Sequence, residues 1–237
     1  ALCFDGQAQL TLVGRLAKWA HEMSDTPKTQ RFPTEFAWEN PMFPPGDAIV
    51  YYCIIREFKP NIVIEVGAGY STLVASKAAS RNGNTRIWVI DPYPPEFLKT
   101  DIPGLERLMI QPVQQIPLSV FESLGPNDVL FIDGTHICKI GSDVNYIVLD
   151  VLPHLRSGVL VHFHDIYLPY EYPEVWVKKE KIFYSEQYLI GAFLMFNEAF
   201  EILLSNIYLG REYHEQLRAA FPLSPSVGGG SLWLRRK

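Results

Sequence analysis

The sequence N-I-V-I-E-V-G-A-G-Y, residues 61–70, decides the fold class of this chain. Its apolar run, Ile62–Ile64, predicts a strand that is buried on both faces. Gly67 and Gly69 then break the strand, and residues 70–79 predict a helix. Strand, glycine turn and helix form the opening unit of a nucleotide-binding α/β domain, in which small residues let a ligand approach the backbone.

Composition and charge narrow the class of protein. The 237 residues are 48% hydrophobic and 20% charged, which is typical of one large globular domain. The net charge of −5 argues against a nucleic-acid partner. No apolar run approaches the roughly 20 residues that a membrane helix needs, and the first residues show no secretory signal. The chain starts without Met, which suggests processing or excision from a longer chain.

These features predict a cytoplasmic enzyme with no membrane partner, and they leave the oligomeric state unknown. Cys3, Cys53 and Cys138 are scattered and odd in number, so we expect reduced thiols rather than a disulfide framework.

Further strands and helices alternate after the glycine turn. Alternation of this kind predicts a parallel, doubly wound sheet. The strand candidates are Thr85–Ile90, Arg107–Ile110, Val129–Ile132 and Val159–Phe163, and the helix candidates between them include Pro117–Leu124 and a segment that Ser142 or Asp143 caps.

The two ends of the chain differ from this core. Residues 1–46 predict a helical and irregular arm, and Asp47 is a suitable N-cap for a helix over Ala48–Phe58. Near the other end, Phe200–Leu209 and Ser231–Leu234 are strand candidates without an ordinary crossover helix between them, which favours an antiparallel pair. We expect a single domain over residues 1–237, with the arm at 1–46 and the α/β core at 47–237.

Acidic residues follow four of the predicted strands directly. Glu65, Asp91, Asp133 and the pair His164–Asp165 stand at these positions. In open α/β sheets ligands bind beyond the carboxyl ends of the strands. We therefore expect these side chains to gather around one binding site.

Two details of the glycine turn distinguish between nucleoside cofactors. Asp91 follows the turn by roughly the 20 residues at which a carboxylate accepts hydrogen bonds from ribose hydroxyls, which suits NAD and S-adenosylmethionine alike. However, Thr72 stands where the dinucleotide fingerprint needs a third small residue. Glu65, two residues before the first glycine, would repel a pyrophosphate but suits a cationic amino acid and sulfonium. Both details favour S-adenosylmethionine.

Four motifs together carry a family resemblance. They are E-V-G-A-G-Y-S-T (65–72), I-D-P (90–92), F-I-D-G-T-H (131–136) and H-F-H-D-I-Y-L-P (162–169). This set resembles class I S-adenosylmethionine-dependent methyltransferases, and most of all the type-24 methyltransferase-domain family, whose relatives include catechol and macrolide-sugar O-methyltransferases. The resemblance implies a Rossmann-like, seven-stranded, mostly parallel sheet whose last two strands are antiparallel. It also implies methyl transfer to the hydroxyl of a small-molecule acceptor.

The resemblance implies a set of cofactor-binding residues. Glu65, Gly67 and Gly69 would line the methionine end, Ser71 would meet the methionine carboxylate, and Asp91 would hold the ribose. The loop 111–115 would lie near the adenine. The full set comprises Glu65, Gly67, Ala68, Gly69, Tyr70, Ser71, Asp91 and Asp133.

Metal-dependent relatives imply a second group of residues. At the matching positions, Asp133, His164 and Asp165 would bind a divalent ion, Mg or Mn, and His136 would be the general base beside Asp133. A hydroxyl bound to a cation loses its proton more easily, and a neutral imidazole can accept that proton. The family usually has oxygen ligands where this chain has His164. Imidazole suits Mn, Fe, Co, Ni or Zn better than Mg.

Alternative interpretations remain open at this point. A metal-dependent hydrolase would use Asp133, His136, His164 and Asp165, and would leave Glu65 and Asp91 without a task. A non-catalytic methyltransferase-like domain would bind a partner protein instead. His162 is more simply a core histidine than a ligand. Four aromatic residues of the loop 166–188 have two alternative roles. They either cap an acceptor pocket or only pack on the sheet edge: Tyr167, Tyr170, Tyr172 and Trp176.

Overall fold

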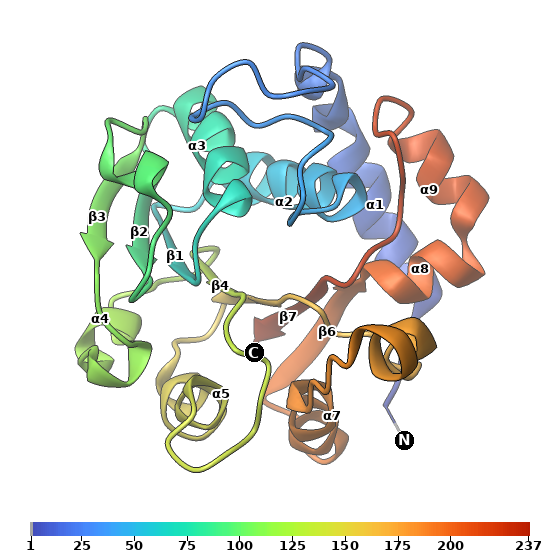
Figure 1. The fold of residues 1–237 in the computed structure, drawn as a ribbon. Coiled ribbons are helices and arrows are strands. Elements are labelled where there is room, and N and C mark those ends of the chain that lie inside the picture. The colour runs from blue at the N-terminus through green and yellow to red at the C-terminus, as the bar shows by residue number, and fades with distance from the viewer. Residues whose placement is uncertain (1) are drawn as a thin grey trace.

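A seven-stranded sheet forms the centre of the computed structural model, which describes residues 2–237 (Figure 1). The strands are β1 (Ile62–Val66), β2 (Arg86–Ile90), β3 (Leu105–Met109), β4 (Val129–Ile132), β5 (Leu160–Phe163), β6 (Phe200–Ser205) and β7 (Leu232–Arg236). They lie in the order β3-β2-β1-β4-β5-β7-β6. β1 to β5 are parallel, and β7 runs antiparallel to β5 and β6. The predicted fold class is confirmed.

Helices cover both faces of the sheet (Figure 1). One layer contains α1 (Gly6–Ala20), α2 (Pro45–Phe58) and α3 (Tyr70–Asn82), with α8 (Asn206–Glu212) and α9 (His214–Ala220) beside α1. The other contains α4 (Leu118–Glu122), α5 (Asp143–Tyr146), α6 (Leu152–His154) and α7 (Glu186–Met195). Short 3-10 helices span His21–Met23, Glu96–Lys99 and Val113–Gln115, and π-helical turns span Ile147–Val151 and Trp176–Glu180. Within residues 2–237 no helix has both the length and the apolar character to cross a bilayer.

The strand β1 illustrates why the central strands are apolar throughout. Val63 packs in the cluster under α1, α2 and α3, whereas its neighbour Ile64 packs in the cluster under α4 to α7. Both side chains are fully buried. Successive side chains of a strand point to opposite faces, so a sheet covered on both faces needs an unbroken apolar run.

The chain reverses its direction across the sheet between β1 and β4. From β1 it proceeds to β2 and β3 on one side, and then returns to β4 and β5 on the other. Backbone bonds join the ends of the central strands: the N–H of Asp133 donates to the carbonyl of Val66, at 2.8 Å, and that of Gly67 donates to Ile90, at 3.0 Å. Such a switch point is where open α/β sheets bind ligands.

Two predictions of local structure are wrong. Asp47 does not cap a helix, because α2 begins at Pro45 and Asp47 is fully buried inside the first turn. The predicted strand Phe200–Leu209 ends at Ser205, whose side chain accepts a hydrogen bond from the N–H of Tyr208 and so starts α8. Local signals mark both boundaries: a proline stands in the first turn of α2, and the Ser205 side chain caps α8.

Candidate functional site

A cavity of about 490 Å³ opens at the switch point. This volume lies within the range of small-molecule sites. Three of the predicted cofactor residues line it, namely Gly67, Asp91 and Asp133, and so does part of the loop that follows β3. The remaining wall consists of Val66, Ile90, Pro92, Tyr93, Pro112, Val113, Gln114, Gly134, Thr135, Lys139, Gly141, Ser142 and Asp143.

Gly67 brings the end of β1 close to the end of β4. Its φ is +86°, a conformation that residues with a side chain rarely adopt. A Cβ atom at this position would lie 1.9 Å from the carbonyl oxygen of Asp133. Only glycine therefore permits this approach, which leaves the cavity open between the two strand ends.

Asp91 holds the two loops that border the cavity. Its Oδ2 accepts a hydrogen bond from the N–H of Ala68 at 3.0 Å, and its Oδ1 accepts one from the N–H of Tyr93 at 2.7 Å. A carboxylate has about four acceptor positions. Asp91 therefore retains lone pairs for ligand hydroxyls after it has ordered both loops.

Glu65, which the family resemblance places at the methionine end of the cofactor, does not line the cavity. It is fully buried, and its oxygens accept hydrogen bonds from the hydroxyls of Tyr51 and Thr72. The Thr72 hydroxyl in turn accepts from the N–H of Gly69, at 3.2 Å. Burial raises the pKa of Glu65 to about 7, although these two hydrogen bonds oppose the shift. Glu65 thus supports the glycine turn from behind.

The other predicted cofactor residues lie in the turn or at the start of α3. Ala68 and Gly69 follow Gly67, and Tyr70 and Ser71 form the first residues of α3. None of the four lines the cavity. The cavity therefore contains Gly67, Asp91 and Asp133 from the predicted set, and the rest of the set supports the turn.

Two carboxylates and a histidine meet beyond β4 and β5. His136 Nε2 lies 3.2 Å from Asp133 Oδ1 and 3.7 Å from Asp165 Oδ2. One potential ligand atom from each of these residues lies within 4.8 Å of the others. The structure thus groups His136 with the two aspartates, at the place where the sequence predicted His164 as the third ligand.

His164 lies close to the same carboxylates. Its Nδ1 is 3.7 Å from Asp133 Oδ1 and 3.5 Å from Asp165 Oδ1, and its Nε2 is 3.6 Å from Asp47 Oδ2. Burial alone would lower the pKa of His164, but Asp133, Asp165 and Asp47 outweigh it and raise that pKa well above its usual value. The surrounding carboxylates of Asp133, Asp165 and Asp47 therefore favour the protonated form of this imidazole.

His136 is held on both ring nitrogens. While Nε2 faces the aspartates, Nδ1 lies 2.9 Å from Glu186 Oε2. Burial lowers the pKa of His136, but its bonds with Asp133 and Glu186 outweigh that effect and raise the pKa to about 10. The pKa of Asp133 is lowered, because the two histidines outweigh the cost of its burial.

His162 is a core histidine. It is fully buried, its Nε2 lies 2.8 Å from the hydroxyl of Ser231, and its ring stacks on Phe131 at 4.0 Å. Burial holds its pKa well below the usual value. It therefore contributes no charge to the site.

Two site residues were not predicted from their motifs. Asp143, interpreted as a helix cap, accepts hydrogen bonds from the N–H of Thr135, at 2.7 Å, and from its hydroxyl, and Ser142 caps α5 instead. Glu186 lies 50 positions from His136. Asp133, which follows β4, predicts where the loop with Thr135 and His136 lies. No local sequence signal indicates that Asp143 and Glu186 contact this loop.

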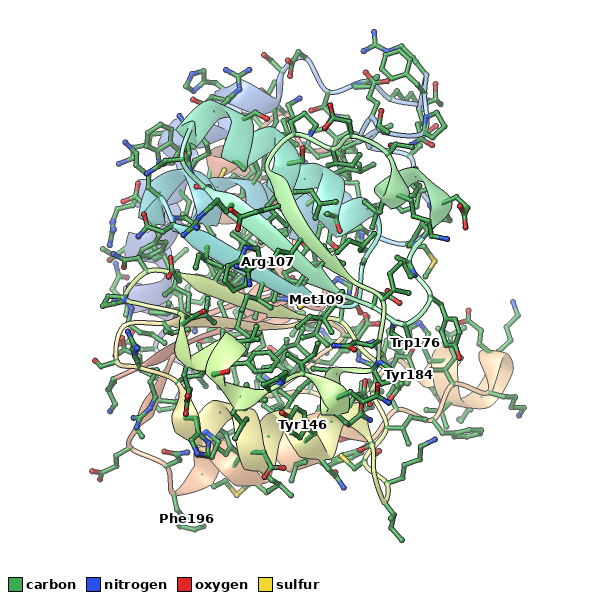
Figure 2. The ribbon with its side chains drawn as sticks, turned by 90° about the vertical axis from the view of Figure 1, so that its left-hand side faces the viewer. Arg107, Met109, Tyr146, Trp176, Tyr184 and Phe196 are labelled. Atoms are coloured by element: carbon green, nitrogen blue, oxygen red, sulfur yellow. The ribbon has the colours of Figure 1, made fainter. Side chains whose placement is uncertain are left out.

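An aromatic cluster borders His136. The ring of Tyr184 lies 4.4 Å from that of His136, and Trp176 lies beside Tyr184 (Figure 2). Trp176 also contacts Tyr167 and Tyr172. These rings pack against one another next to the carboxylates, so both predicted roles for them, packing and an acceptor wall, are compatible with the geometry.

One family model matches the central part of the chain. Residues 64–166 match the family model described as a methyltransferase domain. The match covers three of the four motifs in full and residues 162–166 of the fourth, and it confirms the resemblance to class I methyltransferases over this segment. The segment contains the end of β1 and all of β2 to β5, together with the residues that line the cavity.

One relative in sequence and one solved structure are similar to this chain over different lengths. An uncharacterized protein of Archaeoglobus fulgidus is 36% identical over 92 residues, which cover 37% of this chain and 42% of that protein. This chain therefore aligns with less than half of that relative's length. The O-methyltransferase TomG from Streptomyces achromogenes, solved in complex with SAM, is similar in fold, with a TM-score of 0.50 and 15% identity over 100% of this chain and 92% of TomG.

Proposed function

We propose that this protein is an S-adenosylmethionine-dependent O-methyltransferase that acts on a small-molecule hydroxyl. The observation that carries the proposal is the cavity at the switch point, bordered by Gly67, Asp91 and Asp133, within a segment that matches a methyltransferase domain. TomG, which has the same fold, was crystallised with SAM. A cavity of about 490 Å³ suits a nucleoside with an amino-acid tail.

Asp91 is the proposed ribose ligand. Its two oxygens are already oriented by the N–H groups of Ala68 and Tyr93, which leaves their remaining lone pairs for the two hydroxyls of a ribose. The loop Val113–Gln115 borders the same cavity, where an adenine would pack. S-adenosylmethionine supplies an activated methyl group on a sulfonium, so the protein has to hold and orient the two reactants.

His136 is the proposed general base. It stands beside Asp133 and Asp165, next to the cavity. A base must be neutral, whereas the pKa of about 10 keeps this imidazole protonated at pH 7. A positive charge beside the aspartates lowers that pKa, because it competes with the imidazolium for the same carboxylates. We propose that the bound sulfonium provides this charge.

Metal assistance is proposed on a separate observation. Asp133, His136 and Asp165 present ligand atoms within 4.8 Å of one another. Two carboxylate oxygens and one imidazole nitrogen form a mixed donor set, which suits Mn²⁺ better than Mg²⁺. A divalent ion would make an acceptor hydroxyl more acidic. His136 Nε2 cannot bind the ion and accept a proton at once, so the ion and the free base are alternatives for that atom.

The cofactor proposal is tested by calorimetry with S-adenosylmethionine and S-adenosylhomocysteine. We expect low-micromolar dissociation constants for the parent protein and at least tenfold weaker binding for Asp91→Asn. Asparagine keeps an acceptor for the backbone, so circular dichroism should show an intact fold. Absence of binding to a folded parent protein contradicts the proposal. A panel of phenols and sugars with S-adenosylmethionine, with release of S-adenosylhomocysteine as the signal, then identifies the acceptor.

The metal proposal is tested by titration with Mn²⁺ in the absence of cofactor. We expect binding to the parent protein, and a loss of binding on Asp165→Asn that leaves S-adenosylmethionine affinity unchanged, because Asp165 does not line the cofactor cavity. Binding should also weaken as the pH falls, since the ligands must be deprotonated. A heat signal that persists in Asp165→Asn would place the ion elsewhere and contradict this site.

A further inference from the structure

We propose that Glu186 is a positioning residue that directs Nε2 of His136 toward the reacting hydroxyl. This inference rests on the proposed function, because it extends the role of His136. The carboxylate and the imidazole come from segments far apart in the sequence and meet in a buried contact of 2.9 Å. Both side chains are almost fully inaccessible to solvent.

The backbone of α7 holds the same histidine from a second side. The N–H groups of Ser185 and Glu186 both donate to the carbonyl oxygen of His136, at 2.9 and 3.1 Å. The N–H of Cys138 donates to the Ser185 hydroxyl at 2.9 Å. His136 has a φ of +59°, a strained value for a residue with a side chain, so these contacts are what keep its backbone in place. The start of α7 thus determines where the imidazole lies.

The carboxylate also determines which ring nitrogen reacts. A carboxylate accepts hydrogen bonds and donates none, so its partner nitrogen must carry a proton. The contact with Glu186 therefore keeps a proton on Nδ1 of His136, and the neutral ring has its lone pair on Nε2. That nitrogen faces Asp133 and Asp165, beside the cavity. Nε2 also faces a carboxylate, but the Asp133 side chain is 33% exposed whereas that of Glu186 is 1% exposed, so a ring that gives up one proton keeps the one on Nδ1.

Glu186 has no other task that explains its burial. Its Oε1 has no hydrogen-bond partner among residues 2–237. Its side chain makes no capping bond for α7, whose N-cap is Ser185. A buried carboxylate is costly unless it is paired, and among residues 2–237 the ion pair of Glu186 is with His136.

The experiment compares three variants by NMR with ¹⁵N-labelled histidine. In Glu186→Met the side-chain length is kept and the acceptor is lost, whereas Glu186→Gln keeps an acceptor oxygen. Asp128→Asn is the matched control, because Asp128 is also buried and accepts backbone bonds, from Asn61, Ile62 and Gly125, at the opposite end of β4. The Nδ1–H signal of His136 is assigned by its absence in His136→Gln.

We expect the parent protein, Asp128→Asn and Glu186→Gln to show an Nδ1–H signal that is protected from exchange with water. Glu186→Met should lose it. A protected signal in Glu186→Met overturns the inference, and so does its loss in Asp128→Asn, which would indicate general loosening. These spectra need no cofactor, so they remain decisive even where S-adenosylmethionine fails to bind and the proposed function falls.

The kinetic test uses the first compound of the phenol and sugar panel that gives release of S-adenosylhomocysteine. Glu186→Met should lower kcat by about 10- to 100-fold, the usual effect of removing a partner that orients a functional histidine. Its affinity for S-adenosylmethionine should stay unchanged, because Glu186 does not line the cavity. Glu186→Gln should recover part of kcat. An unchanged kcat in Glu186→Met overturns the inference.

Discussion

At the scale of single residues, Gly67 combines two requirements that no other amino acid meets. Its φ of +86° belongs to the left-handed region, and a Cβ atom would overlap the carbonyl oxygen of Asp133. Gly83, at the end of α3, shares the first requirement with a φ of +83° but has no atom within 4 Å of a Cβ position. A comparison of alanine substitutions at Gly67 and Gly83 therefore separates the cost of backbone strain from the cost of steric overlap.

We expect Gly67→Ala to lower the free energy of unfolding by about 3 kcal/mol or more, since strain and overlap add. Gly83→Ala should cost only about 1 kcal/mol, from strain alone. Urea unfolding of both variants measures the difference. Equal losses would mean that the ends of β1 and β4 can move apart.

Glu65 makes stability depend on pH in an unusual direction for an acid. Its folded pKa of about 7 exceeds the ordinary value of 4.5, so the folded state binds the proton more tightly than the unfolded state. The stability from this group is complete below pH 4.5, and it is lost as the pH rises through 7. The shift corresponds to roughly 3 kcal/mol.

Glu65→Gln should remove this dependence. Relative to the variant, the parent protein should lose roughly 3 kcal/mol of unfolding free energy between pH 4.5 and pH 8. Chemical denaturation at both pH values measures the change, and the comparison of parent with variant cancels the other titrating groups. A constant difference between the two proteins would show that Glu65 titrates near its ordinary pKa.

At the scale of elements, Asp47 joins α2 to the segment before β7. Its carboxylate accepts hydrogen bonds from the side chain of Asn206 and from the N–H groups of Gly230 and Ser231, at 2.7, 3.1 and 3.0 Å. By contrast, Asp5 is an ordinary N-cap, whose side chain accepts from the N–H of Ala8 at the exposed start of α1. A comparison of substitutions at Asp47 and Asp5 thus distinguishes the stability that a tertiary link contributes from that of a local helix cap.

Asp47→Ala should cost about 3 kcal/mol or more, because it leaves several buried donors without a partner. Asp5→Ala should cost about 1 kcal/mol, the usual loss for an N-cap. Thermal unfolding monitored by circular dichroism compares them. Similar losses would indicate that Asp47 contributes no more than a helix cap.

At the scale of the whole molecule, the N-terminal arm is tied to the last strands. Gln9 on α1 is buried, and its Oε1 accepts a hydrogen bond from the N–H of Ser205 at 2.9 Å. Gly6 lies directly against Tyr213, and α1 packs on α2 and α9. Because the two ends of the chain share one core, we propose that residues 1–237 unfold as a single unit.

Scanning calorimetry should therefore give one cooperative transition, with equal calorimetric and van't Hoff enthalpies. An earlier, separate transition of the arm would contradict this proposal. The variant Gln9→Leu, which removes the acceptor for Ser205, should lower the transition temperature without splitting the transition.

Local sequence patterns predict much of the fold. The apolar runs before Glu65, Asp91 and Asp133 predict buried parallel strands, because only strands covered on both faces lack alternation. A turn that contains Gly67 follows the first of them. Even so, the apolar pattern did not predict the start of α2 at Pro45 or the end of β6 at Ser205, since a proline in the first turn and a side-chain cap mark these boundaries rather than hydrophobic periodicity.

The candidate site also combines features that the sequence predicts with features that tertiary packing decides. That Asp91 and Asp133 reach one rim follows from the sequence alone, since parallel strands end on the same side of a sheet. Whether a side chain at such an end faces the cavity or the core depends on packing. The Glu65 side chain lies in the core, where the hydroxyls of Tyr51 and Thr72 donate hydrogen bonds to it.

Sequence by itself determined the class of fold and the rim where its acids gather, because strand burial, glycine turns and helix starts are local properties. Tertiary structure alone decided that Nε2 of His136 faces Asp133 and Asp165, and that Glu186 contacts Nδ1 from the other side. The physical reason is that hydrogen bonds between segments 50 residues apart depend on how helices pack on the sheet, and no spacing along the chain encodes that distance.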